Sequence, residues 1–286
     1  MSVRSAIPFD RLSAQGNVFC VVGASTLSRP IESIDVIRWA GMSKFRDERP
    51  RVGPKRLFDQ LLVIDPAGSS HEHHAVRIYN ADGSAAEQCG NGVRALAFWL
   101  KRRGLDTSLP LRPPAGPVEI VTIADDATRV DHAHVSVRLP GVQSHQRQSL
   151  CGETDATAAM SVSLGNPHLV LHWPHPPRLD ECIDVGQRLQ HHPSFCHGVN
   201  VGLAHPTKDA VHLRVYERGV GPTQACGSGA CAAATAMADW GLKRAPVTLN
   251  QPGGSLVVDW SGEALAAPHL ELTGAVEWIE QGQFQP

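Results

Sequence analysis

Glu87-Gln88-Cys89-Gly90-Asn91-Gly92-Val93-Arg94 and Ala225-Cys226-Gly227-Ser228-Gly229-Ala230-Cys231 both contain the pattern Cys-Gly-x-Gly. Each copy runs into an alanine-rich apolar segment that ends in a tryptophan, Trp99 in the first copy and Trp240 in the second. Cys226 follows Cys89 by 137 residues (226 − 89), close to half of the 286-residue chain. The spacing predicts one structural unit used twice, with a cysteine at the start of a helix in each copy.

A cysteine in that position has a specific chemistry. The first turn of a helix leaves backbone N–H groups without intrahelical partners, and glycine lets an anion approach them closely. The helix dipole also favours a thiolate over a thiol at that end. Two such helix starts facing each other would hold one carboxylate and place a sulfur on each side of its α-carbon. The pattern therefore predicts a two-base racemase or epimerase that needs neither a metal nor an organic cofactor.

The alternative is that Cys89 and Cys226 are ordinary core residues in glycine-rich turns. Cysteine is often a small buried residue, and for either motif alone this explanation is preferred. The repetition at half-chain spacing, with the same downstream pattern, favours the functional interpretation.

Composition indicates a soluble globular protein, with 42% hydrophobic and 19% charged residues, long enough for two domains. The formal net charge of −2 gives no electrostatic reason to expect a nucleic-acid or membrane partner. The first ten residues lack the pattern of a secretory signal. An odd set of seven cysteines without Cys-x-x-Cys predicts reduced thiols in the cytoplasm and no structural zinc site.

Short apolar runs between turn residues predict mostly strands, with helices expected over 31–40, 91–103, 180–190 and 230–240. We interpret 42–56 as an exposed loop and 140–152 as a polar connection between the halves. The cluster His71, His73 and His74 falls at a hairpin tip, where a solvated loop is favoured over a metal site. Together these elements indicate an α+β protein with pseudo-twofold symmetry and a site in the cleft between its halves.

At this level of detail the chain resembles the diaminopimelate epimerase family, over nearly its whole length and most closely over 80–94 and 214–233. The resemblance implies that it converts LL-diaminopimelate to the meso form, for lysine and peptidoglycan precursors. It also implies two pseudo-symmetric strand barrels, each wrapped around a central helix. Residues 1–135 would form the first, with 272–286 returning to it, and 136–271 the second. A homodimer and a small amino-acid substrate are the partners implied.

The resemblance assigns roles to individual positions. Cys89 and Cys226 would exchange the roles of base and acid, and Gly90, Asn91, Gly227 and Ser228 would present backbone N–H groups to the reacting carboxylate. Asn17 and Gln60 would lie near the reacting amino end, although Asn17 alone could simply be a turn residue. The group expected to bind the far end of the substrate is Asn80, Asn166, Asn200, Glu217 and Arg218, with His168 near the site in a supporting role.

One stretch departs from the family pattern. Where the family usually reads His-Gly-Leu-Gly-Asn-Asp-Phe, this chain has Ser13-Ala14-Gln15-Gly16-Asn17-Val18-Phe19. The altered stretch leaves a second hypothesis open, a racemase of the same fold acting on another amino acid such as histidine or proline. The retained Arg218 argues against a substrate without a distal carboxylate, because a buried polar group without a partner is costly. A third hypothesis, a catalytically silent binding protein, is disfavoured because neither thiol is lost.

Overall fold

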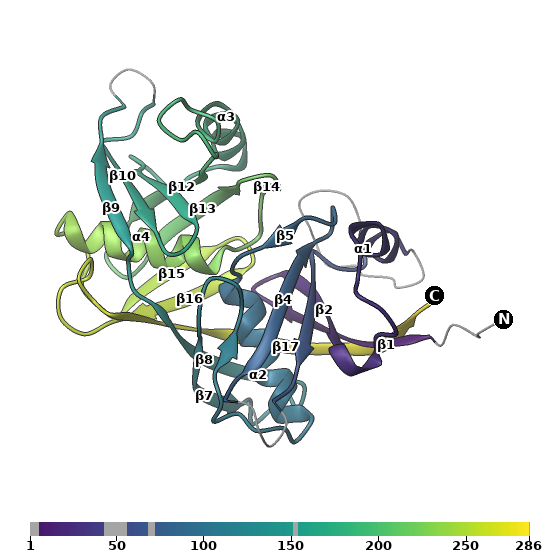
Figure 1. Cartoon of the computed structure of the whole chain (residues 1–286). Coiled ribbons are helices and arrows are strands. Elements are labelled where there is room, and N and C mark those ends of the chain that lie inside the picture. The colour runs from purple at the N-terminus through teal and green to yellow at the C-terminus, as the bar shows by residue number, and fades with distance from the viewer. Residues whose placement is uncertain (1–5, 43–55, 68–71, 151–153, 286) are drawn as a thin grey trace. The chain divides into compact units, whose positions relative to one another are not determined.

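The computed structural model describes residues 6–42, 56–67, 72–150 and 154–285 (Figure 1). Its contacts divide the chain into two compact units, 1–137 with 274–286 (unit 1) and 138–273 (unit 2). Among the described residues, no helix is long and apolar enough to cross a membrane.

In unit 1, most strands pair with the strand that comes next along the chain. Strand β1 is antiparallel to both β17 and β2, β2 is parallel to β3, and β3 is antiparallel to β4. Strand β4 is antiparallel to β5 and parallel to β6, and β8 pairs with β17. The strands are β1 (Ile7–Ala14), β2 (Asn17–Gly23), β3 (Gln60–Asp65), β4 (His74–Asn80), β5 (Ala85–Ala86), β6 (Leu111–Arg112), β7 (Glu119–Asp125), β8 (His132–Pro140) and the later part of β17 (His269–Phe284).

Unit 2 repeats this order of pairings. Strand β10 is antiparallel to both β9 and β11, β11 is parallel to β12, and β12 is antiparallel to β13. Strand β13 is antiparallel to β14 and parallel to β15, and β16 joins β15 to the start of β17. The strands are β9 (Ser144–Gln148), β10 (Ala158–Ser163), β11 (Pro167–His172), β12 (Asn200–Pro206), β13 (Val211–Glu217), β14 (Gly221–Pro222), β15 (Val247–Gln251) and β16 (Gly254–Asp259).

Each unit has one long buried helix, α2 (Gly90–Arg102) in unit 1 and α4 (Gly227–Asp239) in unit 2. All residues of α2 from 90 to 100 are buried, and so are those of α4 from 227 to 237. A helix buried on every side must be surrounded by other elements of the fold, here the strands of its own unit. The prediction of an α+β fold with an internal repeat is confirmed.

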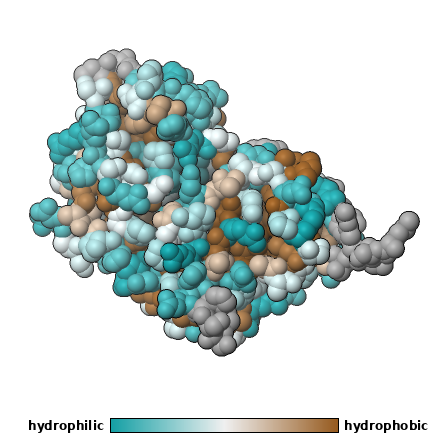
Figure 2. Space-filling model, in the orientation of Figure 1, coloured by the Kyte–Doolittle hydropathy of each residue, from teal (hydrophilic) through white to brown (hydrophobic). Residues whose placement is uncertain are grey.

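The parallel crossovers β2–β3 and β11–β12 each carry one shorter helix, α1 (Ser33–Ala40) and α3 (Leu179–Leu189). Helix α1 starts with a capping box between Glu32 and Asp35 and covers a core in which Trp39 stacks on Phe284 at 4.4 Å between ring centroids. The last strand of the chain is thereby fixed to unit 1. Hydrophobic residues also gather on the outer surface over α1, where Ile34 and Ile37 are exposed (Figure 2). A short 3-10 helix, η1 (Ala24–Thr26), follows β2.

Two expectations about local structure need correction. The polar segment expected as a connection contains a strand, β9, which pairs antiparallel with β10. His74, expected in a solvated loop, is buried at the start of β4. Its Nδ1 accepts the N–H of Ala67 at 3.0 Å, so Nε2 carries the proton and donates to the carbonyl of Asp106 at 2.6 Å. His71 and most of the expected loop 42–56 lie outside the described residues.

Candidate active site

Cys89 and Cys226 occupy the same structural position in the two units. Each is the N-cap of its buried helix, and each Sγ accepts a backbone N–H three residues on, from Gly92 at 3.2 Å and from Gly229 at 3.4 Å. The sulfur thereby replaces the oxygen that usually caps a helix. This position at the positive end of the helix dipole favours the thiolate form of a cysteine.

Packing against the sulfur explains why the third residue after each cysteine is glycine. A Cβ added at Gly92 would lie 3.3 Å from the Sγ of Cys89, and one added at Gly229 would lie 3.3 Å from the Sγ of Cys226. Only a residue without a side chain leaves the capping sulfur its present place. Gly90, Asn91, Gly227 and Ser228 form the first turn beside each sulfur, where helix N–H groups lack intrahelical partners.

The second residue after each cysteine is bound by an asparagine from the neighbouring hairpin. In unit 1 the Nδ2 of Asn91 donates to the Oδ1 of Asn17 at 2.8 Å. In unit 2 the Nδ2 of Asn166 donates to the Oγ of Ser228 at 3.1 Å. Strand β2 begins at Asn17, directly after the β1–β2 turn, and Asn166 lies in the turn between β10 and β11. The structure therefore brings Asn17 to the first cysteine helix and Asn166 to the second.

Gln60 and Asn80 lie next to each other in unit 1. They are directly opposite in the β3–β4 ladder, and the Nε2 of Gln60 donates to the Oδ1 of Asn80 at 2.9 Å. The Nδ2 of Asn80 donates in turn to the Oγ of Ser84 at 3.0 Å. The Oε1 of Gln60 is buried and makes no hydrogen bond to any described residue.

In unit 2, Asn200 begins β12 and Glu217 ends β13, the positions that Gln60 and Asn80 have in unit 1. The Oδ1 of Asn200 accepts the backbone N–H of Arg218 at 2.8 Å, and its Nδ2 donates to the carbonyl of Pro167 at 3.0 Å.

The two residues beside Asn200 are held by separate contacts. A carboxylate oxygen of Glu217 accepts the hydroxyl of Thr223 at 2.8 Å, and Arg218 donates from Nη1 to the carbonyl of His197 at 3.1 Å. Asn200 therefore holds the backbone at Arg218, because it accepts that residue's N–H, while these two contacts hold the side chains.

His168 is buried beside Ser228. Its Nε2 lies 3.0 Å from the Oγ of Ser228 and 3.2 Å from the Oδ1 of Asn166. The Oγ of Ser228 lies 3.6 Å from the Sγ of Cys226. Burial, aided by the positive charge of Arg218, lowers the pKa of His168 to about 3. The imidazole is therefore neutral at neutral pH.

Several polar contacts of the site were not expected from the sequence. The N–H of Cys226 donates to the Oε1 of Gln251 at 2.9 Å, and the Nε2 of Gln251 lies 3.3 Å from the carbonyl of Cys226. Gln251 comes from β15, and nothing in its local sequence marks it. Arg94 donates from Nη2 to the Oδ1 of Asn91 at 2.7 Å and also to Gln15. The available signal for Arg94 was a difference between the two copies of the motif. Arg94 stands five residues after Cys89, where the second copy has Cys231.

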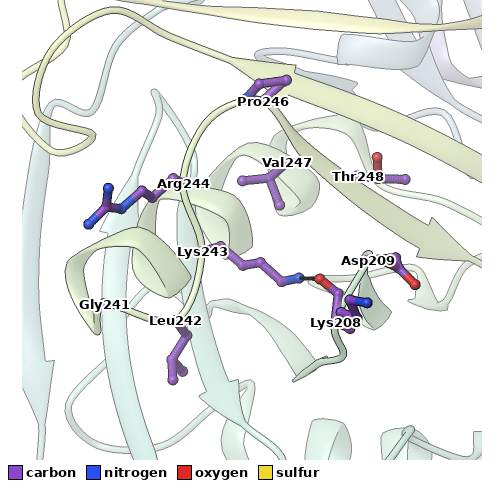
Figure 3. Close-up of a pocket in the computed structure, with 9 residues that line it drawn as sticks. All are labelled: Lys208, Asp209, Gly241, Leu242, Lys243, Arg244, Pro246, Val247 and Thr248. Carbon is purple, nitrogen blue, oxygen red and sulfur yellow. Dashed lines mark hydrogen bonds between the residues drawn. The ribbon is translucent and has the colours of Figure 1, made fainter.

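A cavity of about 370 Å³ lies elsewhere in unit 2, between the β12–β13 turn and residues 241–248 (Figure 3). Lys243 donates from its ammonium to the carbonyls of Thr207 and Lys208, so its charge holds these two segments together. Figure 3 shows Arg244 pointing away from Lys208. The cavity is lined by none of the expected site residues. Within the described residues, no group of three histidine, cysteine or acidic side chains is placed to hold a metal ion.

Comparison with known proteins gives a consistent assignment. The family model "Diaminopimelate epimerase" matches residues 15–137 and 160–279. The diaminopimelate epimerase of Ectopseudomonas mendocina is 34% identical over 293 residues, covering 97% of this chain and 98% of that protein. The diaminopimelate epimerase of Pseudomonas entomophila is 33% identical over 285 residues, with the same coverage.

Solved structures show the same fold at low sequence identity. A phenazine biosynthesis protein of the PhzF family from Bacillus anthracis has a TM-score of 0.70 at 14% identity, covering 99% of this chain and 100% of that one. A hydroxyproline epimerase from Agrobacterium vitis, solved with trans-4-hydroxy-L-proline, has a TM-score of 0.68 at 15% identity, covering 99% and 93%. Both matches to the family model contain one Cys-Gly-x-Gly helix, and the sequence relatives span nearly the whole chain. The chain belongs to the diaminopimelate epimerase family.

Proposed function

We propose that the protein interconverts LL- and meso-diaminopimelate by moving one proton at an α-carbon, with Cys89 and Cys226 as the two bases. The observation that carries this proposal is the repeated N-capping cysteine, which gives each unit one sulfur at the start of a buried helix. The choice of diaminopimelate as the substrate is supported by the relatives at 33–34% identity, which are diaminopimelate epimerases.

The reaction divides into two proton transfers. One thiolate takes the α-proton, so that an S–H bond forms as the C–H bond breaks and the electron pair delocalises into the carboxylate. The thiol on the other side then donates its proton to the opposite face of the carbon. After both transfers the protonation states of the two sulfurs are exchanged, so the first must release its proton to solvent and the second must take one up before another turnover in the same direction. In the reverse direction the two sulfurs exchange roles.

Stabilising the charge on the carboxylate is the largest requirement of this chemistry. The first turns of α2 and α4 supply donors for it, since their backbone N–H groups at Gly90, Asn91, Gly227 and Ser228 are of the kind that lack intrahelical partners. Asn17 and Gln60 are proposed to bind the reacting end of the substrate. The distal end is assigned to the group Asn80, Asn166, Asn200, Glu217 and Arg218, in which Arg218 suits a carboxylate because its guanidinium can donate two parallel hydrogen bonds.

The experiment that tests the proposal follows the α-proton directly. Reduced protein is incubated with LL-diaminopimelate in deuterated water, and both deuterium incorporation and conversion to the meso isomer are measured. We expect deuterium in the product at the inverted centre. Folded, reduced protein that catalyses neither exchange nor conversion would overturn the proposal.

A second candidate, racemisation of histidine or proline by the same two thiols, is favoured by the altered stretch around Val18. In the structure the N–H of Val18 donates to a carboxylate oxygen of Asp59 at 2.7 Å, so an acidic side chain still lies at this turn. The same exchange assay with histidine and proline separates the candidates. Faster exchange with either than with diaminopimelate would favour the second.

We also propose that the protein acts in the cytoplasm, in the synthesis of lysine and peptidoglycan precursors, and as a homodimer. The dimer is the state implied by the family resemblance, and the exposed Ile34 and Ile37 of α1 are apolar side chains that such an interface could cover. Sedimentation velocity over a range of concentrations measures the mass. A monomer at all concentrations would contradict the dimer without affecting the proposed chemistry.

A further inference from the structure

We infer that two hydrogen-bond relays in unit 1 fix which atom Asn17 and Gln60 each present to a ligand. Asn17 presents a donor for a carboxylate, and Gln60 presents an acceptor for an ammonium group. The inference rests on the proposed function, because it assigns the two charged groups of an α-amino acid to these residues.

The first relay starts at Arg94, which is fully buried in α2. An arginine side chain can only donate hydrogen bonds, so the atom of Asn91 that lies 2.7 Å from Nη2 must be its amide oxygen. The amide nitrogen of Asn91 then points the other way and donates to Asn17 at 2.8 Å, which requires the oxygen of Asn17 at that contact. The orientation of each amide follows from the chemistry of the arginine rather than from a choice between similar atoms.

The relay leaves the NH2 group of Asn17 as the part of that amide able to meet a ligand. Among the described residues, none accepts a hydrogen bond from it, and the side chain is only partly buried. Asn17 is therefore a donor and suits the carboxylate oxygens of a substrate. A protonated amine at the same place would meet a donor of like polarity.

The second relay starts at Asp82, an acceptor when ionised. Burial opposes its ionisation, but hydrogen bonds from the hydroxyl and N–H of Ser84 prevail and lower its pKa. The hydroxyl of Ser84 donates its single proton to Asp82 at 2.6 Å, so its oxygen must accept from Asn80. The oxygen of Asn80 then faces Gln60 and accepts from its nitrogen at 2.9 Å.

The second relay leaves an acceptor for the ligand, whereas the first leaves a donor. The Oε1 of Gln60 is buried and has no hydrogen-bond partner among the described residues. A buried acceptor left in this state costs free energy unless a ligand donates to it. An ammonium group is the complementary ligand.

The two presented atoms belong to adjacent strand starts. Strands β2 and β3 are parallel, with Phe19 opposite Gln60, and Asn17 is two residues before Phe19. A donor and an acceptor at the same edge of a sheet match the carboxylate and ammonium groups that an α-amino acid carries on one carbon. Arg94, Asp82 and Ser84 are positioning residues in this scheme, since they act through the two amides.

Ser84→Ala tests the second relay, and the chain offers a matched control. Ser108 makes the same two contacts with Asp106 that Ser84 makes with Asp82, a hydroxyl bond of 2.6 Å and an N–H bond. Ser84→Ala removes the group that orients Asn80 and Gln60, and we expect KM for LL-diaminopimelate to rise about tenfold, with a smaller change in kcat, since a hydrogen bond to a charged group is lost. Ser108→Ala should leave KM unchanged.

A ligand that lacks the ammonium group distinguishes positioning from a general loss of structure. Calorimetric binding of an analogue with hydrogen in place of the reacting-end amine should be equally strong in wild-type protein and in Ser84→Ala. Equal weakening of both ligands, or an unchanged KM for the amino acid, would overturn the second relay.

Asn91→Asp tests the first relay by reversing it. A carboxylate at 91 still accepts from Arg94, so the fold keeps that contact, but Asn17 must now turn its NH2 group toward position 91 and its oxygen toward the ligand. We expect KM for LL-diaminopimelate to rise at least tenfold while the melting temperature stays close to wild type. A variant with wild-type KM would overturn the first relay. Absence of exchange in the wild-type protein itself would instead contradict the proposed function, so the two failures are distinguishable.

Discussion

Unit 1 and unit 2 build the same helix start and then support it with different polar groups. In unit 1 the residue after Cys89-Gly90 is held by Arg94, which is charged at every physiological pH. In unit 2 the corresponding Ser228 is held by a neutral histidine, His168, whose place in unit 1 is taken by Phe19. The backbone is repeated and the buried charge is not.

The difference shows which properties of the site the repeat can supply. Two equivalent thiols are what a reaction with mirror-image faces at one carbon requires, and the repeated N-caps provide them. The substrate is not symmetric about that carbon, so its recognition needs groups that differ between the units. Arg94 in one unit and the Asn166–His168–Ser228 cluster in the other are such groups.

The largest expected effect comes from breaking the equivalence of the two thiols. Cys89→Ser and Cys226→Ser should each lower kcat roughly 10²–10⁴-fold, the usual contribution of a general acid or base, because a serine hydroxyl does not ionise near neutral pH. Cys196→Ser changes an exposed cysteine outside both motifs and serves as the control. Either variant retaining turnover within tenfold of wild type would show that one thiol suffices.

The second comparison concerns the glycines in the turns after β4 and β13. Gly83 and Gly219 both have positive φ, +84° and +75°. A Cβ at Gly83 would lie 2.7 Å from the carbonyl oxygen of Ser33 at the start of α1, whereas one at Gly219 would meet nothing within 4 Å.

Alanine at the two positions should therefore have unequal costs. We expect Gly83→Ala to lower the free energy of unfolding by about 3 kcal/mol, from backbone strain and overpacking together, and Gly219→Ala by about 1 kcal/mol, from strain alone. Urea denaturation measures both. Equal losses would mean that α1 does not constrain the turn of unit 1.

Sequence alone predicted the parts of the site that are local. The cysteine helices were predicted because the capping residue, the glycines and the apolar run are adjacent in the chain, and α2 and α4 begin within a few residues of expectation. Asn17, Gln60, Asn80 and Asn200 were expected near the substrate from the family resemblance, and each lies at a strand end.

The missed features depend on contacts between distant parts of the chain. Strand β9 is almost entirely exposed, so it lacks the apolar alternation that marks a strand and is defined by its pairing with β10. His74 looks like part of a polar cluster, but its two nitrogens are used by segments 7 and 32 residues away. Gln251 reaches Cys226 across 25 residues. The sequence contains no local trace of such contacts.

A smaller effect is expected from the glycine that each thiol caps. A Cβ at Gly229 would lie 3.0 Å from Val215 Cγ2 and 3.3 Å from the Sγ of Cys226, while a Cβ at Gly92 has no contact below 3.3 Å. Alanine favours a helix over glycine, so neither variant should lose stability through propensity. We expect Gly229→Ala to lower kcat roughly tenfold through a displaced thiol, and Gly92→Ala to lower it less. Steady-state kinetics with both variants decide it, and the reverse order would contradict the packing argument.

The smallest effect at neutral pH, and the most specific to unit 2, concerns His168. Its pKa is about 3 in the folded protein and 6.5 as the ordinary value, so between these limits the unfolded chain binds a proton that the folded protein does not. Stability attributable to His168 is therefore full above pH 6.5 and falls as pH decreases toward 3, by at most about 1.4 kcal/mol per pH unit.

His168→Phe gives this position the residue that unit 1 has at Phe19 and removes the titrating group. The variant loses the contact to Ser228, which shifts stability by the same amount at every pH above 6.5. Below that pH its stability should fall less steeply than that of the wild type, which denaturant titrations at pH 4.5, about 6 and about 7.5 measure. Parallel pH dependences in the two proteins would mean that His168 takes up its proton while folded, and that the buried histidine of unit 2 is not held neutral.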